Sequence, residues 1–380
     1  KYLEKTELVS VGRVHDKSPL SVEEMKKMKP LQVANYLKNW KAEKYDPLDR
    51  TIDGFGMALS SLIEENPKQW QHQQSHFINL DRIYVRSFFE GFLKARKAGG
   101  KFDWSNILDF ALDILKKHPA EKDKKSNHAF GFDPNWSWCR RSIADLISDG
   151  LDENKNNIPR KYRKTVWNIL ELLLNETPSN EKRSENYDPL SEAINSIRGV
   201  SMLATIEYGI WLKLDAKGNE NWNILSDAPE LSAKLERHLD LEFDDSLAVR
   251  AVYGQQIGRL TWLDKKWVVS VREKIFPKKQ IDFFDAAWDA YISYNSPNKT
   301  MFDIFQIEYS FGLSRIGKKA SKNRGIVTEE QRLVQHITLF YIWGLVDFKS
   351  DNIWTNFYKN APLSAKQEVI SFIGKTLHDW

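Results

Sequence analysis

Residues Asp188 to Leu212, DPLSEAINSIRGVSMLATIEYGIWL, carry the clearest helical signal in the chain. Asp188 can accept hydrogen bonds from the first free N–H groups of a helix, and Pro189 suits the first helical position because its missing N–H costs nothing there. Apolar residues then recur three, four or seven positions apart, at Leu190, Ile194, Ile197, Leu203, Ile206, Ile210 and Trp211. This spacing predicts one long helix with a wide buried face.

Three residues interrupt that apolar pattern. Gly199 lies inside the predicted helix, where a glycine costs roughly 1 kcal/mol relative to alanine. One interpretation is structural: Gly199 lets a neighbouring helix approach closely, while Asn195 and Arg198 bond to a nearby loop or helix end. The other is functional, with Arg198 in contact with a bound partner.

Helical patterns of the same kind follow one another along the chain, and almost no segment alternates as a strand does. Beyond Leu212 we expect helices at about residues 229–240, 245–256, 258–275, 281–294, 299–317, 328–347, 351–359 and 363–378. Short phrases such as WNIL recur without a fixed period. The sequence therefore predicts an all-α fold, an irregular α-solenoid of antiparallel helix pairs of the TPR or HEAT type. We expect a lead-in of short helices at 1–45 and helical-repeat lobes at 46–187 and 188–380.

The composition narrows the range of functions. Lysine and arginine number 56 against 52 aspartate and glutamate, and the excess of 56 − 52 = 4 is too small to indicate nucleic-acid binding. The single cysteine, Cys139, excludes an internal disulfide, is typical of a reducing cytosol, and is expected to be a buried structural thiol. The longest apolar run, Ile337 to Val346, has 10 residues, whereas a membrane helix needs about 20. We expect a soluble, cytoplasmic protein, and the initial lysine suggests a piece of a longer chain.

Motifs for nucleotide and metal chemistry are incomplete. Gly312 to Lys318 matches a phosphate loop, but Lys319 follows where serine or threonine should bind magnesium. Gly374-Lys375-Thr376 has the correct ending but lacks the first glycine, so we interpret both as helix ends. His72 and His76 have the spacing of a helical metal site without an evident third ligand. We expect no catalytic residues, metal or cofactor in this chain.

Aromatic and arginine side chains are the candidates for binding another molecule. The chain has 14 tryptophans, 20 phenylalanines and 13 tyrosines, which either fill the contacts between helices or anchor protein interfaces. The candidate contact residues are Trp136, Trp138, Arg140, Arg141, Arg198, Trp288, Tyr291 and Tyr294. Arg140 and Arg141 beside two tryptophans, and the basic segment 318–324, would also suit a nucleic acid, which we regard as the less favoured partner.

Several separated phrases, in one order, resemble the C-terminal helical sensor region of bacterial antiviral STAND ATPases, the Avs-type defence proteins. They are DPLSEAINSIRG at 188–199, YGIW at 208–211, YVRSFFEG at 84–91, FDW at 102–104 with Ile107 and Leu108, WSWCRR at 136–141, and the pairs Tyr341 with Gly344 and Ile373 with Gly374. The likeness covers roughly residues 50 to 378.

This resemblance implies a division of labour. An upstream effector, often a nuclease, would precede an ATPase module that binds ATP and magnesium. The C-terminal region would recognise a phage protein such as the large terminase subunit or the portal. Recognition would drive oligomerisation and activate the effector. Two alternatives stay open: a helical scaffold or oligomerisation domain for host proteins, and a nucleic-acid-binding solenoid, which would bind with a steep dependence on salt.

Overall fold

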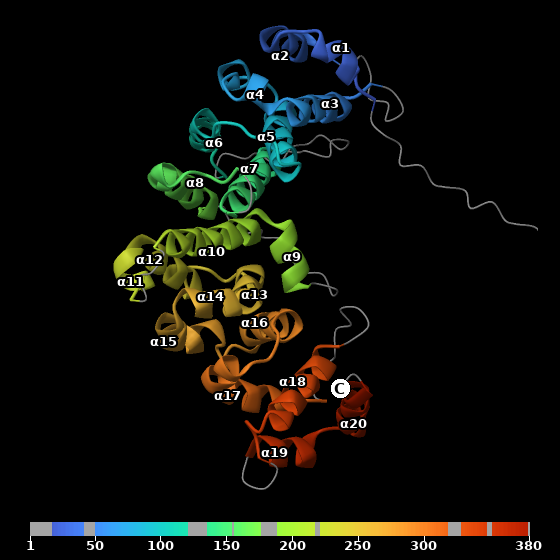
Figure 1. The fold of residues 1–380 in the computed structure, drawn as a ribbon, viewed down its shortest axis with the longest axis vertical. Coiled ribbons are helices and arrows are strands. Elements are labelled where there is room, and N and C mark those ends of the chain that lie inside the picture. The colour runs from blue at the N-terminus through green and yellow to red at the C-terminus, as the bar shows by residue number, and fades with distance from the viewer. Residues whose placement is uncertain are drawn as a thin grey trace, which may run out of the picture. The chain divides into compact units, whose positions relative to one another are not determined.

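The computed structural model describes residues 17–41, 50–120, 135–153, 156–175, 188–216, 221–317, 328–347 and 352–378. The fold is all-α, as predicted (Figure 1). Extended pairing among the described residues is confined to an isolated bridge between Lys17 and Arg50. The chain divides into two compact units, residues 1–177 and 178–380.

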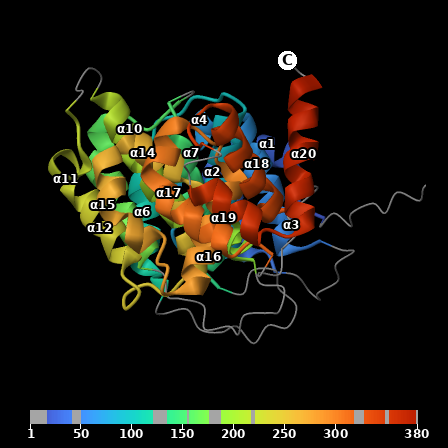
Figure 2. The same cartoon turned by 90° about the horizontal axis from the view of Figure 1, so that it is seen from below.

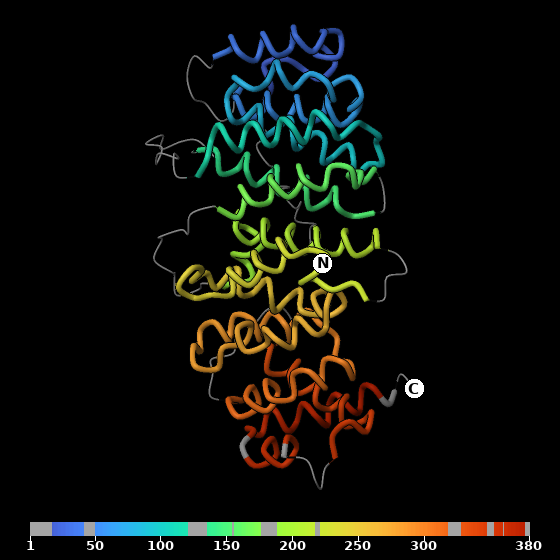
Figure 3. The backbone as a smooth tube through the Cα atoms, turned by 90° about the vertical axis from the view of Figure 1, so that its left-hand side faces the viewer, coloured from blue at the N-terminus to red at the C-terminus, as the bar shows by residue number. Residues whose placement is uncertain are grey.

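Unit 1 is built from helices that pack one on the next. In it α3 packs on α5 and α5 packs on α7, while α6 packs on α8 (Figures 1 and 3). The helix α1 from the predicted lead-in packs on α3, so it belongs to the same unit. The described helices are α1 (Val22–Lys26), α2 (Pro30–Asn39), α3 (Ile52–Glu65), α4 (Pro67–Trp70), α5 (Arg82–Lys97), α6 (Ser105–Lys117), α7 (Ser137–Gly150) and α8 (Arg163–Leu174), with 3-10 turns at Gln74–His76 and Arg160–Tyr162.

Unit 2 repeats this serial packing with more helices. In it α13 packs on both α9 and α16 (Figure 1), while α16 packs on α18, and α18 packs on α20 (Figure 2). Other helices of this unit also pack in pairs: α10 contacts α14, and α17 contacts α19. The helices are α9 (Pro189–Asn195), α10 (Ile197–Asp215), α11 (Ile224–Asp227), α12 (Pro229–Leu239), α13 (Leu247–Gln255), α14 (Ile257–Leu263), α15 (Lys265–Ile275), α16 (Ile281–Tyr294), α17 (Lys299–Ser314), α18 (Glu329–Ile342), α19 (Asn352–Asn360) and α20 (Leu363–His378).

The prediction of one continuous helix over 188–212 is wrong, because the helix is interrupted at Ser196. Ser196 has an extended backbone, with φ −100° and ψ 150°, and its hydroxyl accepts a hydrogen bond from Gly199 N at 3.2 Å. It thus starts a new helix, α10, after the short α9. A Cβ on Gly199 would lie 2.0 Å from the Ala193 carbonyl oxygen, so the predicted close approach is confirmed, and α9 is the helix that approaches.

A second predicted helix, 258–275, is also two helices. Asp264 separates α14 from α15, and its side chain accepts a hydrogen bond from Trp267 N at 2.9 Å. The helix predicted at 281–294 has those bounds in the structure, as does the one at 363–378. The periodicity of the apolar residues located these elements well. It did not reveal the helix breaks at capping residues that lie inside a continuous apolar pattern.

Buried aromatic side chains fill contacts between helices in both units. Trp70, Trp104, Trp211, Trp267 and Trp354 are fully buried. Cys139 is buried as well, in agreement with a structural thiol. None of the described helices combines the length and the apolar composition that a membrane crossing requires.

Candidate functional site

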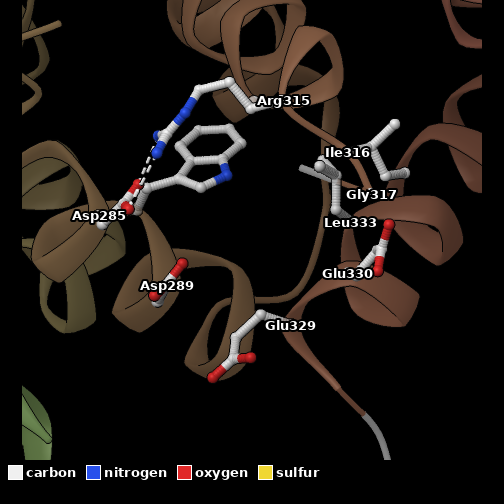
Figure 4. Close-up of a pocket in the computed structure, with 10 residues that line it drawn as sticks. Asp285, Asp289, Arg315, Ile316, Gly317, Glu329, Glu330 and Leu333 are labelled. Atoms are coloured by element: carbon white, nitrogen blue, oxygen red, sulfur yellow. Dashed lines mark hydrogen bonds and ion pairs between the residues drawn. The ribbon is translucent and has the colours of Figure 1, made fainter. Parts of the chain in front are cut away.

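A pocket in unit 2 lies where α16, the end of α17 and the start of α18 meet (Figure 4). It comprises about 520 Å³ of atom-free space, including its open mouth. Helix α16 contributes Asp285, Trp288 and Asp289, and α17 with the residues after it contributes Gly312, Arg315, Ile316 and Gly317. Helix α18 contributes Glu329, Glu330 and Leu333. The lining therefore combines an indole ring, two aliphatic side chains and charged groups.

The indole of Trp288 is held in place by its neighbours. It stacks on Phe284 with ring centroids 5.7 Å apart and meets Tyr309 edge-on at 5.2 Å. A Cβ on Gly312 would lie 2.9 Å from Trp288 Nε1, so the absence of a side chain at 312 leaves room for the ring. The wall of the pocket is thus a rigid aromatic surface, fixed by packing.

Glycine also shapes the turn after α17. Gly317 has φ +74°, a left-handed conformation that ends helices, and it lies against the ring of Pro362. The segment that matches a phosphate loop is thus a helix end, as interpreted, with Gly312 inside α17. The following lysines and the basic segment 318–324 lie outside the described residues. Gly374, in contrast, lies inside α20, so its interpretation as a helix end is wrong.

The pocket lining has more negative than positive groups. Arg315 makes two hydrogen bonds to the carboxylate of Asp285, at 2.5 and 3.0 Å, which raise the pKa of the guanidinium. Asp289 is 8% exposed, and Glu329 and Glu330 each have one buried carboxylate oxygen. With one arginine and four carboxylates, the formal charge of the lining is 1 − 4 = −3. Partly desolvated carboxylates attract a cation more strongly than exposed ones do.

Behind the pocket, a chain of buried hydrogen bonds ties the three helices together. The hydroxyl groups of Tyr291 and Tyr309 lie 2.8 Å apart, and the Tyr309 hydroxyl lies 2.9 Å from His336 Nδ1. Burial, followed by the charge of Arg332, lowers the pKa of His336 to about 4, so the ring is neutral near pH 7. A neutral ring can accept the Tyr309 proton at Nδ1. The network fixes α16, α17 and α18, and therefore the pocket.

The structure places the three candidates from α16 in different environments. Trp288 lines the pocket, as just described. Tyr291 is fully buried in the hydrogen-bond chain, so it is a structural residue and not a surface contact. Tyr294 is exposed near the end of the helix. Of the residues predicted to contact a partner, Trp288 is therefore the one in the pocket.

The candidates near residue 140 belong to unit 1 and divide in the same way. Trp138 is exposed, while Trp136 stacks on His118 with ring centroids 3.6 Å apart. Arg140 is buried and donates a hydrogen bond to the carbonyl oxygen of the same histidine at 3.2 Å, which removes it as a surface anchor. Arg141 forms an ion pair with Asp145 on the next turn of α7 at 3.7 Å.

Arg198 makes a structural contact, in line with the first of the two interpretations given for this residue. It forms an ion pair with the buried Asp244, which also lies 2.6 Å from His238 Nδ1. Burial alone would raise the pKa of Asp244, but the hydrogen bond from His238 and the charge of Arg198 outweigh it and hold the pKa below its usual value. Arg198 therefore joins α10 to the loop before α13. Asn195 bonds within α9, to the Ser191 carbonyl oxygen at 2.7 Å.

Sequence reasoning missed the charged residues of the pocket. Asp285, Trp288 and Asp289 have the i, i+3, i+4 spacing of one helix face, and that signal was available. Glu329 and Glu330 look like ordinary charges in the first turn of a helix, where they complement the helix dipole. Their place beside α16 follows from tertiary packing, which a single sequence does not reveal.

Comparison of the chain with family models, curated proteins and solved structures gave no match. His72, one of the two histidines with metal-site spacing, lies within hydrogen-bond distance of Gln71 and Asn106. Within the described ranges, no three His, Cys, Asp or Glu side chains are placed to hold a metal ion. The pocket brings carboxylates together with an indole, a combination that suits an organic cation.

Proposed function

We propose that this chain is the recognition region of a bacterial anti-phage STAND ATPase. It binds a phage structural protein, the large terminase subunit or the portal. The observation that carries the proposal is the preformed pocket of unit 2, in which a fixed indole and partly buried carboxylates are held on three packed helices. Such a site, on rigid elements, suits selective recognition of a partner. The sequence phrases that resemble the Avs-type sensor region supply the identity of the partner.

We further propose that the serial packing in each unit is that of an irregular α-solenoid. In unit 1 α3, α5 and α7 pack in succession, and in unit 2 α9, α13, α16, α18 and α20 do so. Helices stacked in this manner expose one edge of each pair along the array, which is how repeat proteins bind extended partners. The pocket would then be one contact point within a larger surface.

In this proposal the chain binds and does not catalyse. ATP and magnesium would be bound by an ATPase module elsewhere in a longer cytoplasmic protein, and binding of the phage protein would favour oligomerisation and activation of an effector. The binding energy would have to favour the oligomerising conformation over the resting one, since a ligand shifts an equilibrium only by its differential affinity.

The test is co-purification of the tagged chain with purified large terminase subunits and portals from a panel of phages. We expect one of these protein classes to be retained and the chain alone to release no phosphate from ATP. Retention is also measured with the Trp138→Ser variant, which is altered at an exposed residue of unit 1. This variant tests whether the partner contacts unit 1 in addition to the pocket in unit 2. Retention of neither protein class, or ATP hydrolysis by the chain alone, would contradict the proposal.

A scaffold or oligomerisation domain is the second candidate, and a specific surface favours it. Tyr341, Ile342 and Trp343 at the end of α18, and Tyr358 on α19, are all exposed. Tyr341 meets Trp354 edge-on at 5.4 Å, and Tyr358 stacks on the same ring at 5.5 Å. Adjacent exposed aromatic side chains are typical of protein interfaces. Stable dimers in light scattering without any phage protein, abolished by Trp343→Ser, would favour this candidate.

A further inference from the structure

We infer that the pocket between α16, α17 and α18 receives an arginine side chain of the bound partner. The inference rests on the proposed function, because it names the chemistry by which the partner is recognised. It is carried by the charge of the pocket, by its aromatic wall and by the form of the ion pair already present at its rim.

The charge of the pocket calls for a cation. The lining has four carboxylates, on Asp285, Asp289, Glu329 and Glu330, and a single arginine. In Figure 4 Asp289 lies on the left of the opening, Glu329 at its bottom and Glu330 on the right, on α16 and α18. Arg315, at the top, is turned to Asp285, which lies on the left above Asp289. An incoming positive group would therefore face several carboxylates at once, from two different helices.

The walls indicate an organic cation and not a bare ion. The pocket lining also includes the indole of Trp288 and the aliphatic side chains of Ile316 and Leu333. An indole attracts a cation through the face of its ring, and the aliphatic side chains stabilise the methylene groups that carry it. A metal ion with its shell of water would gain nothing from these three side chains.

Within the basic side chains, the arrangement favours arginine over lysine. A guanidinium is planar, stacks on aromatic rings and donates two parallel hydrogen bonds to a carboxylate, whereas an ammonium is a compact point charge. The chain's own Arg315 binds Asp285 in this two-bonded manner, at 2.5 and 3.0 Å. Its guanidinium also lies 5.8 Å from the centroid of the Phe284 ring, which stacks on Trp288. The rim of the pocket thus already holds one guanidinium between a carboxylate and an aromatic ring.

A direct test uses N-acetyl-L-arginine amide as the probe and N-acetyl-L-citrulline amide as its neutral analogue of the same shape. Binding is followed through the indole N–H signal of Trp288 in ¹⁵N NMR spectra, assigned with Trp288→Phe. We expect a saturable shift with the arginine probe at millimolar concentrations and at least about tenfold weaker binding of the citrulline probe, because the charge-assisted hydrogen bonds are lost.

Variants locate the effect within the pocket. Asp289→Asn combined with Glu330→Gln keeps the shape and removes two charges, and we expect it to weaken the arginine probe at least tenfold. Asp303→Asn is the matched control, since Asp303 is an exposed carboxylate on α17 that pairs with Lys299 and lies outside the pocket lining. If the double variant fails to fold by circular dichroism, Glu330→Gln alone, on the first turn of α18, replaces it.

Equal binding of the two probes, unchanged affinity in the pocket variants, or no shift of the Trp288 signal would overturn the inference. A shift of that signal by calcium chloride that arginine does not compete away would assign the pocket to a metal ion instead. The two proposals fail separately. If the arginine probe binds through Asp289 but no terminase or portal does, the proposed function fails and the pocket assignment stands. If a phage protein binds the wild type and the double variant equally, the pocket assignment fails and the proposed function stands.

Discussion

At the scale of single residues, His336 connects the pocket to the stability of unit 2. It lies one helical turn after Leu333, shares a hydrogen bond with the Tyr309 hydroxyl, and is surrounded by the rings of Tyr291, Tyr309 and Phe340. Burial holds its pKa near 4, compared with 6.5 for a free histidine. The folded protein therefore excludes a proton that the unfolded chain takes up.

This difference gives a pH dependence with a defined sign. Between pH 6.5 and about 4 the unfolded chain binds more protons than the folded one, so the free energy of unfolding falls as the pH falls through this window and is fully retained above it. The loss attributable to His336 is about 3 kcal/mol. Thermal unfolding of wild type and His336→Phe at pH 7 and pH 4.5 measures it. An equal loss in both proteins would show that other groups are responsible.

At the scale of elements, the close contact between α9 and α10 determines how the first two helices of unit 2 pack on each other. Gly199 allows the backbone of α10 to approach Ala193, where a Cβ would lie 2.0 Å from the carbonyl oxygen. Backbone atoms cannot move aside as a flexible side chain can. The clearest helical phrase in the sequence is therefore a helix, a sharp break and a second helix, with the glycine at the crossing.

Alanine substitutions at two helical glycines separate this contact from helix propensity. We expect Gly199→Ala to destabilise unit 2 by about 1–3 kcal/mol or more, as other substitutions that overfill a packed site do. Gly374→Ala is the control, because a Cβ there meets nothing within 4 Å and lies inside α20, where alanine gains up to about 1 kcal/mol. Differential scanning calorimetry of the whole chain compares the two. Equal melting temperatures for the two variants would remove the close contact as an explanation.

At the scale of the whole molecule, the sequence predicted the fold class and the positions of most helices, because periodicity reports burial directly. It did not predict the breaks at Ser196 and Asp264, where a local cap ends one helix and starts another within a continuous apolar pattern. Of the candidate contact residues, Trp288 lines the pocket, whereas Arg140 and Tyr291 are buried. An aromatic or an arginine looks the same in sequence whether it packs inside or faces a partner.

The proposed recognition requires a surface that is already formed in the isolated chain. Its pocket residues come from three helices that buried rings and the Tyr291–Tyr309–His336 hydrogen bonds hold together. A site preorganised in this way loses little conformational freedom on binding, which favours affinity. We therefore expect the isolated chain to bind its partner without the remainder of a longer protein.

Isothermal titration of the isolated chain with purified large terminase subunit, and separately with portal, tests that claim most directly. We expect saturable binding of one of them, weakened at least tenfold by Asp289→Asn with Glu330→Gln and unchanged by Asp303→Asn. No heat of binding with either protein from any phage tested, by a chain that is folded by circular dichroism, would contradict the account.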